Sequence, residues 1–309
     1  MSSPASGRFK NHLSRGVRED AASVKNMLFM NNNVIQLIML VLFVSYKPAY
    51  SQYEINENII ASTVYLEFKD TEGIHFGSGV LLRDTSDWLY VVTARHVICN
   101  ITPEGCALKD TIMYIGFPNG MNYNNQTGVI VNLKKIVTNK LATISTVSDL
   151  AVITLGKFES NSFSFLKCAD VKELSSDSSV LLQVVNTNDM LGFEGSKLAN
   201  DVIVVGYPNV LGSKFGYNQF DKTRPLIRKG AVAGKNISNR TIIIDSPAYG
   251  GNSGGPVWQL LPAEKRFKII GIVSEYIPSD KEIIDNSGYL VCVPIDEVHS
   301  LISKLSIGK

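Results

Sequence analysis

The sequence has almost no net charge, and it lacks a hydrophobic run long enough to span a membrane. Its 30 basic residues are balanced by 28 acidic ones, which argues against a nucleic-acid-binding surface and against an acidic interaction tail. The apolar run at residues 34–46 is short of the roughly 18 residues that a transmembrane helix requires. Internal repeats and low-complexity tracts are also lacking, which excludes fibrous and repeat architectures.

The first 51 residues are typical of an export signal that is preceded by a polar extension. The length of the apolar run suits the hydrophobic region of a signal peptide, and Ala49 and Ser51 provide small residues before a cleavage site. We therefore predict cleavage after Ser51, export to the periplasm or the medium, and no membrane span in the mature protein. Translation from Met27 or Met30 would give the signal a more usual length before the apolar run. The alternative to cleavage is retention of the whole N-terminus, with the run as a weak anchor.

Only 4 cysteines are present, an even number that is compatible with an oxidising compartment. Cys99 and Cys106 enclose a short loop and are spaced to form a local disulfide. Cys168 and Cys292 have an equally good interpretation as two buried free thiols, which pack as small hydrophobic side chains.

From residue 59 onward, short apolar segments alternate with clusters of Gly, Asn, Asp and Ser, which predicts an all-β fold. We expect strands at 63–68, 79–83, 88–93, 111–115, 128–132, 150–154, 201–206, 230–234, 241–245, 254–259, 268–273 and 289–294. Only residues 295–305 carry apolar side chains at helical spacing, which predicts one C-terminal helix packed on a barrel.

The strongest chemical signal is the segment GGNSGG at residues 250–255. Glycines on both sides of Ser253 allow the backbone to approach a substrate closely. The Lys-Ser/Thr ending of a nucleotide-binding loop is missing, which leaves a nucleophilic serine or a purely structural turn. A serine nucleophile needs a neighbouring base.

His96 and Asp149 are the candidate partners of this serine. His96 follows an apolar expected strand, and Asp149 opens another, where a buried carboxylate would be costly without a partner. An imidazole that acts as a base needs such a carboxylate to hold its tautomer and to stabilise its charge. Taken singly, each residue has an ordinary structural explanation, a packed histidine or a turn aspartate.

Together these motifs resemble the chymotrypsin-like serine peptidase family, in its compact bacterial form related to the high-temperature-requirement and glutamyl-endopeptidase groups. The order His, Asp, Ser along the chain is that of the family, and the separations between the three suit two successive barrels. The likeness extends over about residues 57–305 and includes FGSGV at 76–80, VGYP at 205–208 and GIVS at 271–274.

The resemblance implies a peptidase domain over residues 52–309, with two six-stranded antiparallel β-barrels at about 57–160 and 161–294 and a helix at 295–305. It implies a serine endopeptidase that acts on proteins or peptides without a metal or a cofactor. Ser253 would attack the scissile carbonyl, His96 would transfer the proton and Asp149 would orient the imidazole. The backbone N–H groups of Gly251 and Ser253 would form the oxyanion hole. We expect no PDZ module in the residues after Ser253.

Substrate preference follows from the same resemblance. The family position at the base of the primary specificity pocket is Pro247, and one wall comes from Ser274, Glu275 and Tyr276. Selection of Lys or Arg requires a carboxylate at the base of this pocket, and Tyr276 narrows the pocket. We therefore expect the substrate residue before the scissile bond to have a small or medium apolar side chain. A catalytically silent relative used for binding is the main alternative, and a fold that cleaves esters or only itself is a second.

Overall fold

The computed structural model describes residues 55, 57–69, 73–103, 105–118, 127–159, 162–166, 172–173, 182–208, 224–279 and 286–307. The chain divides into two units, Met1–Gln52 and Tyr53–Lys309, and every described residue lies in the second. The predicted leader and Cys168 therefore lie outside the described residues. Among the helices within the described ranges, none is both long enough and apolar enough to cross a membrane.

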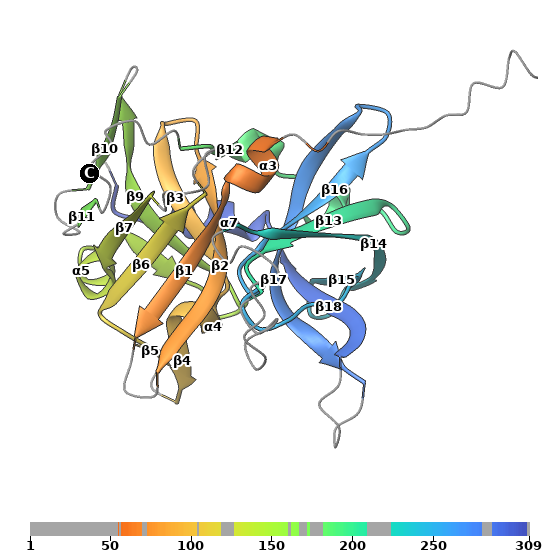
Figure 1. Cartoon of the computed structure of the whole chain (residues 1–309), viewed down its shortest axis with the longest axis horizontal. Helices are drawn as coiled ribbons and strands as arrows, with labels where there is room; N and C mark the ends of the chain where they lie inside the picture. The colour runs from red at the N-terminus through yellow and green to blue at the C-terminus, as the bar shows by residue number, and fades with distance from the viewer. Residues whose placement is uncertain are drawn as a thin grey trace, which may run out of the picture. The chain divides into compact units, whose positions relative to one another are not determined.

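The first half of this unit is a curled sheet of ten strands (Figure 1). Its order is β10-β9-β3-β2-β1-β6-β7-β11, with β8 beside β9 and β12 beside β2. The strands are β1 (Thr63–Lys69), β2 (Ile74–Arg83), β3 (Trp88–Thr93), β6 (Ile112–Phe117), β7 (Thr127–Asn132), β8 (Ala142–Ile144), β9 (Ala151–Glu159), β10 (Ser162–Phe165), β11 (Lys172–Glu173) and β12 (Val185–Asn186).

The second half is a closed antiparallel barrel in the order β13-β14-β15-β18-β17-β16. Its strands are β13 (Asp201–Gly206), β14 (Leu226–Asn236), β15 (Thr241–Asp245), β16 (Pro256–Leu261), β17 (Arg266–Pro278) and β18 (Asn286–Pro294). A separate hairpin, β4 (Cys99–Thr102) and β5 (Gly105–Leu108), follows β3 and lies below the first sheet in Figure 1.

Alternating side chains of the central strands serve two different hydrophobic cores, which explains why these strands are apolar throughout. In β3, Leu89 and Val91 pack inside the first sheet, whereas Tyr90 and Val92 pack in a second core together with Val205 of the barrel. A residue period of two places successive side chains on opposite faces. The second core therefore joins the two halves, and the C-terminal end of β3 reaches this junction.

Short helices connect the strands: α3 (Glu57–Ala61), α4 (Arg95–Ile98), α5 (Leu133–Thr138), α6 (Gly192–Gly195) and α7 (Glu297–Ile302), together with the 3₁₀ turn η2 (Thr187–Asp189). The C-terminal helix α7 buries Val298 and Leu301 in the core between the halves. It is shorter than the predicted 295–305, because the chain beyond Ile302 tightens into i→i+3 turns, in which the N–H of Leu305 bonds to the carbonyl of Ile302.

The predicted fold class is confirmed: the described chain is mostly β, with a closed six-stranded barrel and a short C-terminal helix. The first half differs in detail from a six-stranded barrel. Its hydrogen-bonded order runs outward from β9 to β10 on one side and from β7 to the two-residue strand β11 on the other. Within the part of the chain that the structure describes, these two edges do not pair.

Candidate active site

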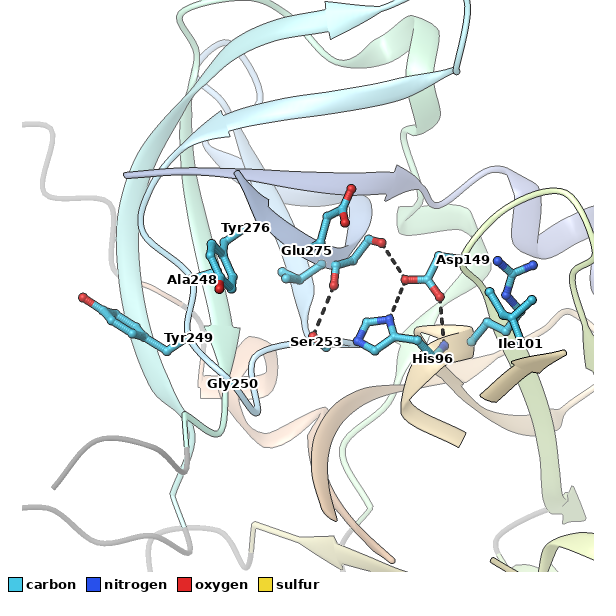
Figure 2. A pocket seen from close by; sticks show the side chains of 12 residues that line it. His96, Ile101, Asp149, Ala248, Tyr249, Gly250, Ser253, Glu275 and Tyr276 are labelled. Carbon is cyan, nitrogen blue, oxygen red and sulfur yellow. Dashed lines mark hydrogen bonds and ion pairs between the residues drawn. The ribbon is translucent and has the colours of Figure 1, made fainter. Parts of the chain in front are cut away.

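His96 and Asp149 are brought together by the pairing of β3 with β9. His96 lies in α4, directly after β3, and Asp149 lies just before β9; the register aligns Thr93 with Ala151. The His96 Nδ1 atom lies 2.7 Å from Oδ2 of Asp149, and the His96 backbone N–H donates to Oδ1 at 2.9 Å (Figure 2). One carboxylate therefore fixes both the ring and the backbone of the histidine.

A third contact comes from the second half of the fold. The Ser274 hydroxyl donates to Oδ2 of Asp149 at 2.5 Å. Burial alone would raise the pKa of Asp149, but the hydrogen bonds from His96 and Ser274 and the attraction to His96 outweigh burial and lower this pKa to about 2. Asp149 is thus a carboxylate at neutral pH, and the proton between it and His96 resides on Nδ1.

Ser253 lies in the turn between β15 and β16, next to the ring of His96 (Figure 2). Its hydroxyl donates to the backbone carbonyl of Ser274 at 3.2 Å rather than to His96. Rotation about the Cα–Cβ bond redirects the hydroxyl, and hydrogen bonds of this kind commonly tighten only when substrate is bound.

Two backbone N–H groups beside Ser253 are available for a ligand. Among the described residues, the N–H groups of Gly251 and Ser253 have no acceptor, whereas the N–H of Asn252 between them bonds to the Tyr249 carbonyl at 3.0 Å. Gly251 has φ +96°, a backbone conformation that a side chain would disfavour. The turn therefore presents two donors within one short segment.

A cavity of about 450 Å³ adjoins these groups. Its walls come from the segment that precedes Ser253, from the end of β17 and from the region around His96. The lining residues are Arg95, His96, Ile101, Asp149, Ala248, Tyr249, Gly250, Ser253, Val273, Ser274, Glu275 and Tyr276. Of the predicted specificity residues, Ser274, Glu275 and Tyr276 line the cavity, whereas Pro247 does not and its neighbour Ala248 does.

Among the described residues, nothing pairs with one side of β17 beside this cavity. β17 pairs with β16 only as far as Ile272 and then continues to Pro278 with β18 alone. An open strand edge can accept an extended peptide as an added strand. Residues 274–276 therefore offer backbone hydrogen-bonding groups along the cavity wall.

Several lining residues were not anticipated from the sequence. Ile101 lies on the β4–β5 hairpin, which a disulfide between Cys99 and Cys106 closes, and this side chain is 65% exposed. Tyr249 stacks under the Arg228 guanidinium at 4.6 Å. The cysteine spacing is a signal for the hairpin, but the sequence contains no signal for the contribution of Ile101 to the cavity. Cys292 is a buried free thiol.

Residues 77–261 match the model of the trypsin-like peptidase domain family. This match covers more than half of the chain, and the chain belongs to that family. No curated protein sequence matches the chain.

Several solved structures are similar to this chain at low sequence identity. A thermostable serine protease, AL20, from an extremophilic microorganism has a TM-score of 0.51 at 11% identity, with 81% of this chain and 100% of that chain covered. An HtrA-type protease with a tripeptide has a TM-score of 0.48 at 14% identity, with 82% and 63% covered. The serine endoprotease from Yersinia pestis has a TM-score of 0.44 at 16% identity, with 82% and 66% covered. This chain thus spans about two thirds of the length of the last two proteins.

Proposed function

We propose that this protein is a serine endopeptidase in which Ser253 is the nucleophile, His96 the general base and Asp149 the residue that orients it. The observation that carries the proposal is the set of contacts at Asp149, which holds the imidazole at 2.7 Å beside Ser253 within one cavity. Its lowered pKa supports the role, because the carboxylate stays ionised when the imidazole becomes charged.

The proposed reaction begins when the Ser253 hydroxyl turns from the Ser274 carbonyl towards Nε2 of His96. Oγ attacks the scissile carbonyl while Nε2 takes the hydroxyl proton, and the carbonyl oxygen becomes an oxyanion held by the N–H groups of Gly251 and Ser253. His96 then gives the proton to the leaving amine. Water, activated by the same imidazole, hydrolyses the acyl-enzyme and restores Ser253.

For the substrate, we propose an extended protein or peptide segment that adds to the open edge of β17. Ala248, which is small, and the bulky Tyr276 both line the cavity, so the residue before the scissile bond is expected to be small or medium and apolar. Pro247, the predicted base of the pocket, does not line the cavity, and its neighbour Ala248 lines it instead. Neither residue supplies a carboxylate, which argues against a preference for Lys or Arg.

Export of the protein is a further part of the proposal. The compact unit begins at Tyr53, close to the predicted cleavage after Ser51, and the Cys99–Cys106 disulfide suits an oxidising compartment. Mass spectrometry of the protein recovered from its producing cells tests this part: a mature N-terminus at Gln52 is expected, and an intact N-terminus would contradict cleavage.

Cleavage of a fluorogenic peptide library by the full-length protein tests the enzymatic proposal. Wild-type protein should hydrolyse peptides, and Ser253→Ala should reduce kcat by about 10⁵-fold or more, because the nucleophile is lost. Ser303→Ala, which alters an exposed serine beyond α7, is the matched control and should retain full activity. Wild-type activity no greater than that of Ser253→Ala would contradict the proposal and favour a catalytically silent binding module.

A further inference from the structure

Ser78 lies on β2, in the first half of the fold, and contacts the turn that carries Ser253 in the second. It is fully buried, and all of its hydrogen-bonding groups are used. Its hydroxyl donates to the carbonyl of Gly251 at 2.7 Å, and its backbone N–H donates to the carbonyl of Ser253 at 2.8 Å. It therefore holds the two residues whose N–H groups are free to bind an oxyanion.

These two bonds fix peptide planes rather than side chains. The plane between Gly251 and Asn252 is held at its oxygen by Ser78 and at its N–H by the Tyr249 carbonyl at 3.0 Å. This plane separates the two oxyanion donors, so its orientation sets the direction in which both N–H groups point. A peptide plane that is held at both ends cannot rotate without breaking a buried hydrogen bond, which is unfavourable.

The Ser78 hydroxyl is itself oriented by its neighbours. The Tyr207 N–H donates to Oγ at 2.9 Å, so the hydroxyl proton is directed to Gly251. The Thr93 hydroxyl donates to the Ser78 carbonyl at 2.7 Å, and Thr93 lies three residues before His96. Ser78 thus connects the strand that leads to His96 with the turn that bears the nucleophile.

The packing around this residue is tight. A Cβ atom on Gly254 would lie 2.0 Å from the Ser78 carbonyl oxygen, and one on Gly206 would lie 3.1 Å from the Ser78 hydroxyl. Gly254 also has φ +87°. The approach of the two halves at this point therefore depends on glycine opposite Ser78.

We propose that Ser78 is a positioning residue that holds the oxyanion hole of Gly251 and Ser253 in its binding conformation. The inference rests on the proposed function of this site. Without the hydroxyl, the Gly251 carbonyl loses its buried donor and the plane beside it is free to turn. The result is weaker stabilisation of the oxyanion, whereas the peptide-binding edge of β17 is unchanged.

The test compares Ser78→Ala with Ser62→Ala in the full-length protein. Ser62 is also fully buried, but it follows α3 directly, and its hydroxyl donates to the carbonyl of Ile59 in that helix at 3.1 Å rather than to the turn. Because loss of a direct oxyanion donor typically lowers kcat by about 10²–10³-fold, loss of a residue that positions the donors should lower kcat by about 10–100-fold at an unchanged KM. Ser62→Ala should leave kcat unchanged.

A peptide aldehyde provides a second readout, because it adds to Ser253 and places an oxyanion in the hole. Ser78→Ala should weaken aldehyde inhibition by the same factor. Binding of an uncleaved peptide is measured in Ser253→Ala and in the double variant Ser78→Ala with Ser253→Ala, and both proteins should bind it equally well. Ser78→Cys, which keeps a weak donor, should show an intermediate loss of kcat and serves if the alanine variant fails to fold.

The inference is overturned if Ser78→Ala retains the wild-type kcat, if aldehyde and peptide binding weaken equally, or if Ser62→Ala loses as much activity. Wild-type protein that cleaves no peptide would instead contradict the proposed function itself.

Discussion

Ser274 donates its hydroxyl hydrogen bond to Oδ2 of Asp149, the oxygen that also contacts Nδ1 of His96. The same residue accepts the Ser253 hydroxyl at its backbone carbonyl. One residue of β17 therefore contacts both the carboxylate and the nucleophile, and it couples this strand to the proposed catalytic groups.

Replacement of Asp149 by Asn should lower kcat by about 10⁴-fold, because the amide no longer holds the imidazole in the tautomer that accepts the serine proton. Steady-state hydrolysis of a fluorogenic peptide measures this loss. Asp201→Asn, at an exposed position paired with Lys229, is the matched control and should keep full activity. A loss below tenfold for Asp149→Asn would show that this carboxylate does not orient the base.

The lowered pKa of Asp149 also predicts a pH-dependent stability. Because the folded-state pKa, about 2, lies below the ordinary 3.8, ionised Asp149 stabilises the fold above about pH 4, and this contribution is lost as the pH falls towards 2. Linkage puts the contribution at about 2 kcal/mol. The test measures the free energy of unfolding of wild type and of Asp149→Asn in urea between pH 5 and pH 2. The difference between the two proteins should decrease by that amount as the pH falls. A difference that stays constant over this range would contradict the shift.

Tyr276 should limit the size of the side chain accepted before the scissile bond. Tyr276→Ala is expected to raise kcat/KM for peptides with Leu or Phe at that position by about tenfold, with little change for Ala, since one methylene group is worth about 1–3 kcal/mol in a hydrophobic pocket. Library cleavage measures the change. The control is Tyr289→Ala, an exposed tyrosine on β18 outside the cavity lining. A strong preference of the wild type for Arg or Lys would refute this placement of the pocket.

Reduction of the Cys99–Cys106 disulfide should loosen the hairpin that carries Ile101. The closed loop is short, with a sequence separation of 7, so the loss of stability should be about 2 kcal/mol, accompanied by an increase in KM for peptides that contact this wall. Thermal unfolding with and without dithiothreitol measures the effect in wild type. The double variant Cys99→Ser with Cys106→Ser should not respond to the reductant, and an equal response of both proteins would place the effect elsewhere.

Much of the fold could be predicted because its strands are contiguous, buried and apolar. The expected boundaries of β3, β13 and β15 coincide with those observed. Very short strands were missed: β8, β11 and β12 have only two or three residues, and their conformation depends on pairing with distant strands rather than on local preference.

The site likewise contains residues that the sequence predicts and contacts that it does not. His96, Asp149 and Ser253 have local signatures in the flanking sequence, and the structure brings all three to one cavity. The contact of Ser274 with Asp149 spans 125 residues, and that of Ser78 with Gly251 spans 173. Such contacts depend on the packing of the two halves against each other, which no short sequence pattern encodes.

The central claim is that Ser253 is an activated nucleophile, and reaction with a fluorophosphonate probe tests it most directly. Intact-mass and peptide mass spectrometry of the full-length protein should find one phosphonyl group on Ser253 in wild type. The group should be absent from Ser253→Ala and formed far more slowly in His96→Ala. Folded wild-type protein that remains unlabelled, or that is labelled equally in Ser253→Ala, would contradict the account.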